Sequence, residues 1–293
     1  MAGQLKEVRN RIKSVQSTQQ ITKAMKMVSA AKLRRAQDAI IQMRPYAQKL
    51  QEMLSNIVSN SEGGAGMSLA TERPVEKVLL ILITSDRGLA GAFNANLIKL
   101  AKSTIAEKYT EQQKKGNVTV WGIGKKGYEY FVRANYKTSA DFKDIFLQLN
   151  FGNVQKAAQA AMKAFEAKEF DVVEIIYSQF KNAATQKFEL ERFLPIPKVE
   201  KKAGAVKADF IYDPSKEELI AELMPKILNT QLYKAVLDSN ASEHGARMTA
   251  MDKASENANE MLRALKISYN RARQAAITTE LTEIVSGAAA LQG

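Results

Sequence analysis

The chain has 293 residues, with 43 Lys and Arg against 31 Asp and Glu, a formal net charge of +12, no cysteine and one histidine. The missing cysteines exclude disulfides, cysteine-based zinc sites and thiol nucleophiles, and a single histidine excludes a histidine-rich metal site. An apolar fraction of 45% is typical of a folded protein, and without a run of 18 apolar residues the chain is not expected to span a membrane. Its first residues lack the apolar core of a secretory signal, so we expect a protein inside the cell or on the cytoplasmic side of a membrane.

Residues 1–60 are predicted to form a coiled-coil helix, because they contain one proline, Pro45, and no glycine after Gly3. Apolar and small residues step by three and four from Leu33 to Ile57, as in a heptad pattern. Pro45 is expected to bend or disturb this helix. The segment carries 11 basic and 3 acidic side chains. Such a helix can pair with nucleic acid, an anionic membrane or an acidic protein, or its charged face can simply be solvated.

The middle of the chain has the pattern of an α/β domain over residues 75–197, after a Gly-rich linker at 61–74. Strands alternate with helices, which predicts a mainly parallel, Rossmann-like sheet. The predicted strands are 75–85, 117–124, 171–180 and 187–193, and the predicted helices are 95–108 and 154–168. A polar connector at 198–208 closes this inserted domain.

Residues 209–293 are predicted to form the second coiled-coil helix. From Lys226 to Ser286 there is no proline and one glycine, and seam residues step by four and three. A helix of about 60 residues is roughly 90 Å long and needs a partner along its length. The N-terminal helix is the obvious partner, and chain reversal through the middle domain makes the pair antiparallel. Many seam residues are Ala, Ser or Thr, which fits either close packing of two helices or a thin end inside another protein.

Two short motifs in the middle domain lie where α/β folds can bind ligands. Gly122, Gly124 and Gly127 fit the GxGxxG pattern of dinucleotide-binding turns, but they follow the second strand rather than the first, so a tight strand-to-helix turn is favoured. The second motif, residues 85–88, follows the first strand, at the edge where α/β sheets often bind ligands. With no His or Cys near it, a turn or protein contact is favoured over a catalytic Ser85. The single His244 is expected to be a surface or helix-packing residue.

Three motifs in chain order resemble the gamma subunits of F-type ATP synthases, over nearly the whole length. They are ITKAMKMVSAAKLRRAQ at 21–37, SDRGLAGAFN at 85–94 and ITTELTEIVSGAAA at 277–290. The resemblance implies a rotor shaft that couples rotation of the proton-driven membrane c-ring to conformational cycling of a ring of three alpha and three beta subunits. It also implies that the chain is not an enzyme and binds no cofactor or metal.

The resemblance further implies which residues contact the other subunits. It places Met25, Lys26, Arg273, Gln274 and Thr278 against a beta subunit. The C-terminal signature residues are Ile277, Thr278, Glu280, Glu283, Gly287 and Ala288, the inserted-domain loop is Ser85, Asp86, Arg87 and Gly88, and the foot near epsilon and the c-ring contains Tyr212 and Asp213.

The implied location is the cytoplasmic face of the bacterial inner membrane, reached only through the complex. Without cysteine, the dithiol regulation of plastid-type members is excluded. Two alternatives stay open from the residues alone. One is a dinucleotide-binding oxidoreductase domain on a coiled coil, and the other is a basic, nucleic-acid-binding coiled coil, which the low aromatic content (7%) does not favour and the resemblance does not imply.

Overall fold

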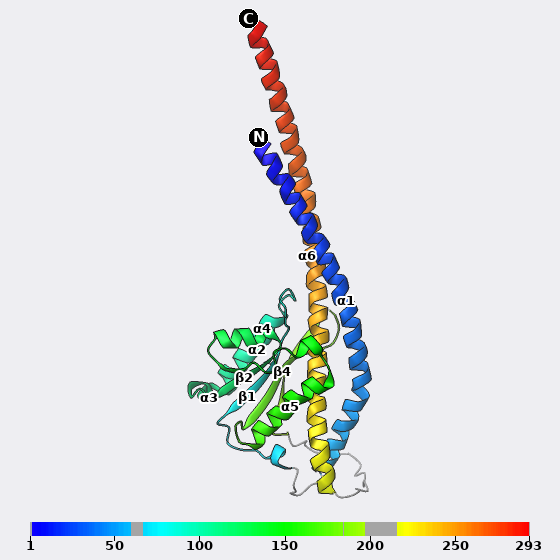
Figure 1. Cartoon of the computed structure of the whole chain (residues 1–293), viewed down its shortest axis with the longest axis vertical. Coiled ribbons are helices and arrows are strands. Elements are labelled where there is room, and N and C mark those ends of the chain that lie inside the picture. Colours follow the sequence, from blue (N-terminus) through cyan, green and yellow to red (C-terminus); the bar gives the residue numbers. More distant parts are fainter. Residues whose placement is uncertain (1, 60–66, 184, 197–215, 293) are drawn as a thin grey trace. The chain divides into compact units, whose positions relative to one another are not determined.

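The computed structural model describes residues 2–59, 67–183, 185–196 and 216–292. Its backbone contacts divide the chain into two compact units, one formed by residues 1–29 and 248–293 and the other by residues 30–247. Two long helices belong partly to each unit: α1 (Ala2–Ser59) and α6 (Lys216–Gln292). The predicted mixed α/β fold with long N- and C-terminal helices is confirmed (Figure 1).

Both long helices continue through a proline. The helix α1 runs through Pro45, and α6 begins at Lys216, ten residues before the proline-free run that starts at Lys226, so that Pro225 lies inside it. A proline removes one backbone donor from a helix. Around Pro225 the buried side chains of Met224 and Ile227 provide packing that offsets this loss, because tertiary burial rather than propensity supplies most helix stability.

The second unit contains a five-stranded sheet with the order β3-β2-β1-β4-β5. Parallel pairing joins the first four of these strands, and β5 pairs antiparallel with β4. The strand bounds are β1 (Val78–Ile83), β2 (Val118–Ile123), β3 (Lys137–Ser139), β4 (Val172–Phe180) and β5 (Gln186–Leu194). The short edge strand β3 was not predicted, because three polar residues carry no periodic signal.

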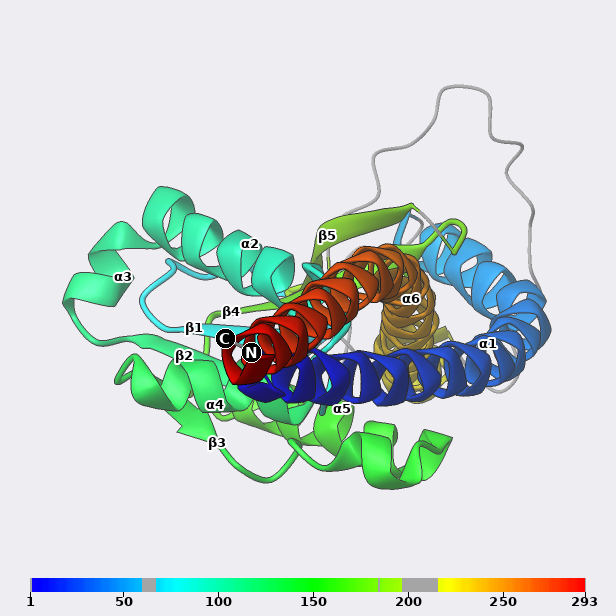
Figure 2. The ribbon, with the colours of Figure 1, turned by 90° about the horizontal axis from the view of Figure 1, so that it is seen from above.

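Helices cover both faces of this sheet, so every residue of β1 is buried. On one face α2 (Phe93–Lys108) and α4 (Lys125–Arg133) pack over a core that contains Phe93, Leu97 and Phe131. On the other face α5 (Phe151–Glu166) and the first part of α6 enclose a second core. Figure 2 shows α2 and α5 on opposite sides of the strands. The remaining elements are α3 (Thr110–Lys114), η1 (Met67–Ala70) and η2 (Ile145–Gln148).

Candidate functional site

The loop that follows β1 is held by its own side chains. The Ser85 hydroxyl donates to the Arg87 carbonyl at 2.7 Å and accepts from Asn94 Nδ2 at 2.7 Å. The Ser85 amide donates to Asn94 Oδ1 at 3.0 Å. Ser85 is therefore engaged in shaping the turn, and its partners are an amide and a backbone carbonyl rather than a base that could activate it as a nucleophile.

The start of α4, which the GxGxxG pattern would offer to a phosphate, is already filled by the protein. The first three amides of this helix donate to Asp86 Oδ1 (Lys125 amide, 3.2 Å), to the Ser85 carbonyl (Lys126 amide, 3.1 Å) and to Thr84 Oγ1 (Gly127 amide, 2.8 Å). These are the amides that a pyrophosphate would need. Because these amides are already bonded within the protein, they are not free to bind a dinucleotide, which counts against the dinucleotide-binding alternative.

The glycines of this turn are explained by packing. A Cβ added to Gly124 would lie 2.1 Å from the Thr84 carbonyl oxygen, and Gly124 has a φ of +100°. A Cβ on Gly122 would lie 2.9 Å from the backbone nitrogen and the Cβ of Tyr128. The three glycines thus let the second strand, its turn and α4 approach the end of β1, as the favoured interpretation of the sequence predicted.

The carboxyl edge of the sheet, where α/β folds commonly bind ligands, is covered by α6. Ser239 Oγ donates to the Ile83 carbonyl at 3.4 Å and Ser242 Oγ to the Ser178 carbonyl at 3.1 Å. Arg247 donates to the carbonyls of Gly88 and Arg87. The polar side chains of α6 therefore bind the strand ends and the loop in the place that a ligand would take.

Three ionisable groups around this edge have shifted pKa values because they are withdrawn from water. Burial raises the pKa of Asp86, although the Lys125 amide acts in the opposite direction. Burial also raises the pKa of Glu243, which forms an ion pair with Arg247 at 2.5 Å. Burial, with the charges of Lys32 and Arg247, lowers the pKa of His244 to about 4. His244 is therefore neutral at pH 7 and partly buried in α6.

In the first unit α1 and α6 form an antiparallel pair. Four side-chain contacts show this direction, because they pair rising residue numbers in α1 with falling residue numbers in α6. These are Arg9 Nη2 to Tyr269 Oη (2.9 Å), Gln19 to Asn259, Thr22 Oγ1 to Ser255 Oγ (2.7 Å) and Lys26 Nζ to Asp252 Oδ1 (2.5 Å). Polar pairs join the two helices at these points, so the register is specified by hydrogen bonds as well as by apolar packing.

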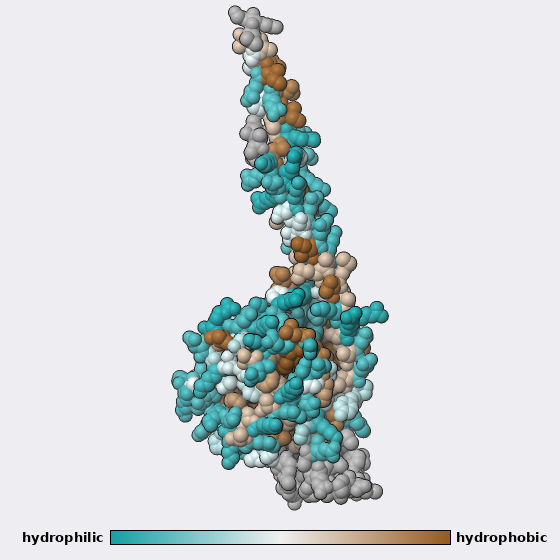
Figure 3. All heavy atoms as spheres, in the orientation of Figure 1, coloured by the Kyte–Doolittle hydropathy of each residue, from teal (hydrophilic) through white to brown (hydrophobic). Residues whose placement is uncertain are grey.

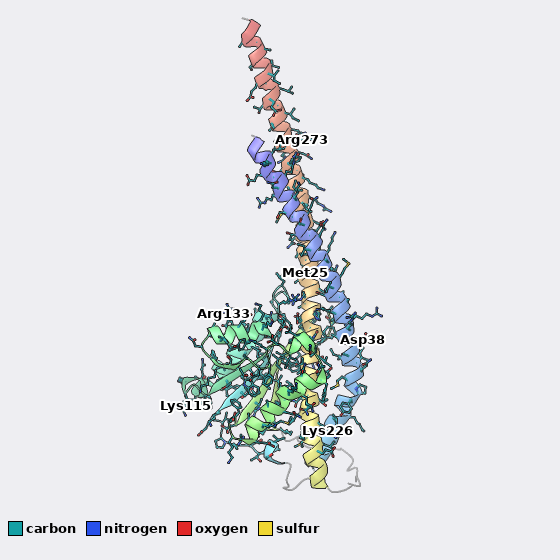
Figure 4. The ribbon with its side chains drawn as sticks, viewed as in Figure 1. Met25, Asp38, Lys115, Arg133, Lys226 and Arg273 are labelled. Carbon is teal, nitrogen blue, oxygen red and sulfur yellow. The ribbon has the colours of Figure 1, made fainter. Side chains whose placement is uncertain are left out.

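The residues predicted to contact a beta subunit lie on both helices of this unit (Figure 4). Met25 is half-buried, and Lys26 pairs with Asp252 of the same chain, a partner that the sequence pattern did not predict. Arg273 and Gln274 are exposed. Thr278 is exposed too, and its hydroxyl donates to the Gln274 carbonyl at 2.9 Å. The predicted foot residues, Tyr212 and Asp213, lie outside the described residues.

The C-terminal signature lies beyond the start of α1. Since Arg9 contacts Tyr269, the antiparallel register brings Ala2, the first residue of α1, level with about Ala276. The remaining helix to Gln292 has no partner in α1, and every residue from Glu280 to Ala290 is exposed.

An apolar stripe follows this exposed stretch, and the sequence interpretation missed it. Ile277, Leu281, Ile284 and Val285 are 48%, 57%, 67% and 67% exposed. Their spacing puts them on one face of the helix. At about 100° per residue this face lies opposite the half-buried Ala272, Ala276 and Thr279, which continue the seam toward α1. Figure 3 shows hydrophobic side chains along one side of this end of the helix.

Within the described ranges no group of three His, Cys, Asp or Glu could hold a metal ion. Among the helices described, none has the length and apolar character needed to cross a membrane.

Comparison with known proteins decides the family. A model of the family described as ATP synthase matches residues 4–291. The ATP synthase gamma chain of Cytophaga hutchinsonii is 54% identical over 290 residues, covering 98% of both chains. That of Flavobacterium johnsoniae is 53% identical and covers 99% of both chains. This chain belongs to the ATP synthase gamma-chain family.

Solved structures show that the fold of the family is kept at much greater distance. A chain from the Euglena gracilis mitochondrial ATP synthase, in a structure of OSCP, F1 and the c-ring, has a TM-score of 0.70 at 21% identity, covering 99% of this chain and 95% of that one. A chain from the central stalk and c-ring of the Tetrahymena thermophila enzyme has a TM-score of 0.57 at 23% identity, covering 80% and 99%.

Proposed function

We propose that this chain is the central rotor shaft of an F-type ATP synthase. It couples rotation of the proton-driven membrane c-ring to the conformational cycling of three alpha and three beta subunits, in ATP synthesis and in the reverse, ATP-driven pumping of protons. The chain itself carries out no catalysis. Membership of the gamma-chain family supports this function, as do relatives whose structures are described as central stalk and rotor.

The observation that carries the proposal is the exposed apolar stripe at the end of α6. Such a stripe on a helix in water requires a partner. Among the described residues the one long helix that pairs with α6 is α1, which starts level with about Ala276 and packs on the opposite face. A ring of alpha and beta subunits that encloses this end would bury the stripe. Because this end of α6 as a whole is thin and rich in Ala and Thr, the helix can turn inside the ring.

The polar residues beside the stripe are proposed as contacts with a beta subunit. Arg273 and Gln274 flank the start of the stripe, at about 40° and 60° on either side of Ile277. Arg273 would meet acidic loops of the ring, and Thr278 lies one turn further on. From α1, Met25 and Lys26 would meet another beta loop, with Lys26 exchanging Asp252 for an acidic partner.

The other end of the chain is proposed to contact epsilon and the c-ring through the foot at Tyr212 and Asp213. The proposed domain map is 1–60 and 209–293 for the coiled coil, 75–197 for the inserted domain, and 61–74 and 198–208 for its linkers. The chain would lie at the cytoplasmic face of the bacterial inner membrane, as a peripheral member of the complex.

Co-expression with the alpha and beta subunits tests the proposal. We expect the chain to co-purify with both, and we expect a Leu281→Glu/Ile284→Glu variant to lose this co-purification or the coupling of the complex. Ser286→Glu is the control on the opposite face of the same helix, where it adds one negative charge against the two of the double variant. A chain that does not associate with alpha and beta subunits, or that tolerates both changes equally, would contradict the proposed role.

A further inference from the structure

A buried ion pair on α6 holds the loop that follows β1. Glu243 and Arg247 are only 9% and 8% exposed and lie one helical turn apart, with 2.5 Å between Glu243 Oε1 and Arg247 Nη2. The same guanidinium donates to the carbonyls of Arg87 and Gly88. A buried charge is tolerated only where it is paired and hydrogen-bonded, so Glu243 both neutralises Arg247 and points it at the loop.

The loop itself has a conformation that needs support. Leu89 has a φ of +63° and Gly91 a φ of +58°, both in the left-handed region. For a leucine this region is costly, and such residues persist where the surroundings hold them. Leu89 is also 66% exposed, so its own side chain contributes little packing. The loop is held at two points. Near its start Asp86 accepts a hydrogen bond from the Lys125 amide of α4, and further along the Gly88 carbonyl accepts one from Arg247 of α6.

The arrangement joins two parts that are far apart in sequence. Arg247 is the last residue of the second unit, and α6 continues from it as an unbroken helix into the first unit. The loop, in contrast, is covalently continuous with β1 at the centre of the sheet. The first part of α6 shares a core with the sheet, and at Arg247 the loop adds a further connection to α6 through charge-assisted hydrogen bonds.

We propose that Glu243 and Arg247 form a latch that fixes the loop after β1 to α6, so that the loop and α6 turn as one body. Arg247 is the coupling residue, and Glu243 is a positioning residue that acts through it. The inference rests on the proposed rotor function, since a latch of this kind matters only if the chain transmits torque.

Loss of the guanidinium should release the loop. Hydrogen bonds to charged groups shift an equilibrium by about 10- to 100-fold. In Arg247→Ala the amides whose hydrogen bonds depend on this loop, those of Ser85 (to Asn94) and Lys125 (to Asp86), should therefore exchange hydrogen about 10- to 100-fold faster. Glu243→Gln should produce a smaller increase in the exchange rate, because it removes the charge that orients Arg247 but keeps the size and shape of the side chain. Amides of β1, bonded within the sheet, should keep their protection in both variants.

The functional test uses the assembled complex in membrane vesicles. We expect Arg247→Ala to lose proton pumping per ATP hydrolysed. The Gly88→Cys/Arg247→Cys variant should regain pumping when a short bismaleimide bridges the two thiols, since this chain has no other cysteine. Each single-cysteine variant, treated with the same reagent, is the control. If Arg247→Ala does not assemble, Glu243→Gln takes its place in the exchange and pumping measurements.

The outcomes separate this inference from the function on which it rests. Wild-type pumping per ATP in Arg247→Ala or in its Glu243→Gln substitute, or a loss that the crosslink does not repair, would overturn the latch and leave the rotor role intact. A wild-type chain that does not assemble with alpha and beta subunits would instead overturn the rotor role.

Discussion

Replacing Gly124 with alanine tests whether the GxGxxG turn serves packing or cofactor binding. An added Cβ at this position would lie 2.1 Å from the Thr84 carbonyl oxygen and 3.2 Å from Thr84 Oγ1. The first distance is far below any real contact, and the atom it meets is backbone, which moves only if the end of β1 moves.

The expected cost has two parts. Holding a residue other than glycine at a φ of +100° costs about 1–3 kcal/mol. Relieving the overlap by shifting the packed backbone costs another 1–3 kcal/mol or so. We therefore expect Gly124→Ala to lower the free energy of unfolding by about 2–6 kcal/mol. If the glycine were present only to let a dinucleotide approach, the protein without a cofactor would be unaffected.

Urea unfolding followed by tryptophan fluorescence measures this change. Trp121 is the one tryptophan of the chain and lies in β2, with its ring 5.1 Å from that of Phe142. Gly88→Ala is the matched control, because a Cβ there meets nothing within 4 Å, and we expect a change within about 0.5 kcal/mol. Equal stability of the two variants would refute the packing argument.

Three further predictions concern the helices. Thr22→Val should cost about 0.5–1.5 kcal/mol, because it removes the 2.7 Å hydrogen bond to the Ser255 hydroxyl, which keeps its bond to the Met251 carbonyl. Thr22→Val/Ser255→Ala should cost less than the single changes added together, and additive losses in thermal unfolding would count against the pair. The lowered pKa of His244, about 4, means that the unfolded chain binds more protons between about pH 6.5 and 4, so stability is present above this window and lost as pH falls through it, by about 3 kcal/mol at most. His244→Gln should remove this part of the pH dependence, and an unchanged slope would contradict the assignment. Met25→Lys should reduce proton pumping per ATP more than it reduces stability, because it adds a charge at the proposed beta contact. Met25→Leu is the control, and unchanged pumping per ATP in Met25→Lys would contradict this prediction.

Local sequence pattern determined much of the fold. Long stretches with one proline (Pro45) and one glycine (Gly245) between them predicted the two helices, and the continuous apolar run of β1 predicted a strand buried on both faces. These signals are local, so the chain shows them without any knowledge of its tertiary neighbours. The three family motifs added a function that periodicity alone does not contain, and the comparisons with relatives support it.

Only the tertiary structure decided what the ambiguous residues do. Gly124 and the start of α4 have the pattern of a phosphate site, yet Thr84, Ser85 and Asp86 fill it from some 40 residues away. The pairing of Lys26 with Asp252 spans 226 residues. Likewise, the spacing of Ile277 and Leu281 predicts an apolar face, but only the antiparallel register shows that α1 leaves it uncovered. Pairings at such separation depend on how the whole chain folds back on itself, and a local pattern carries no record of that.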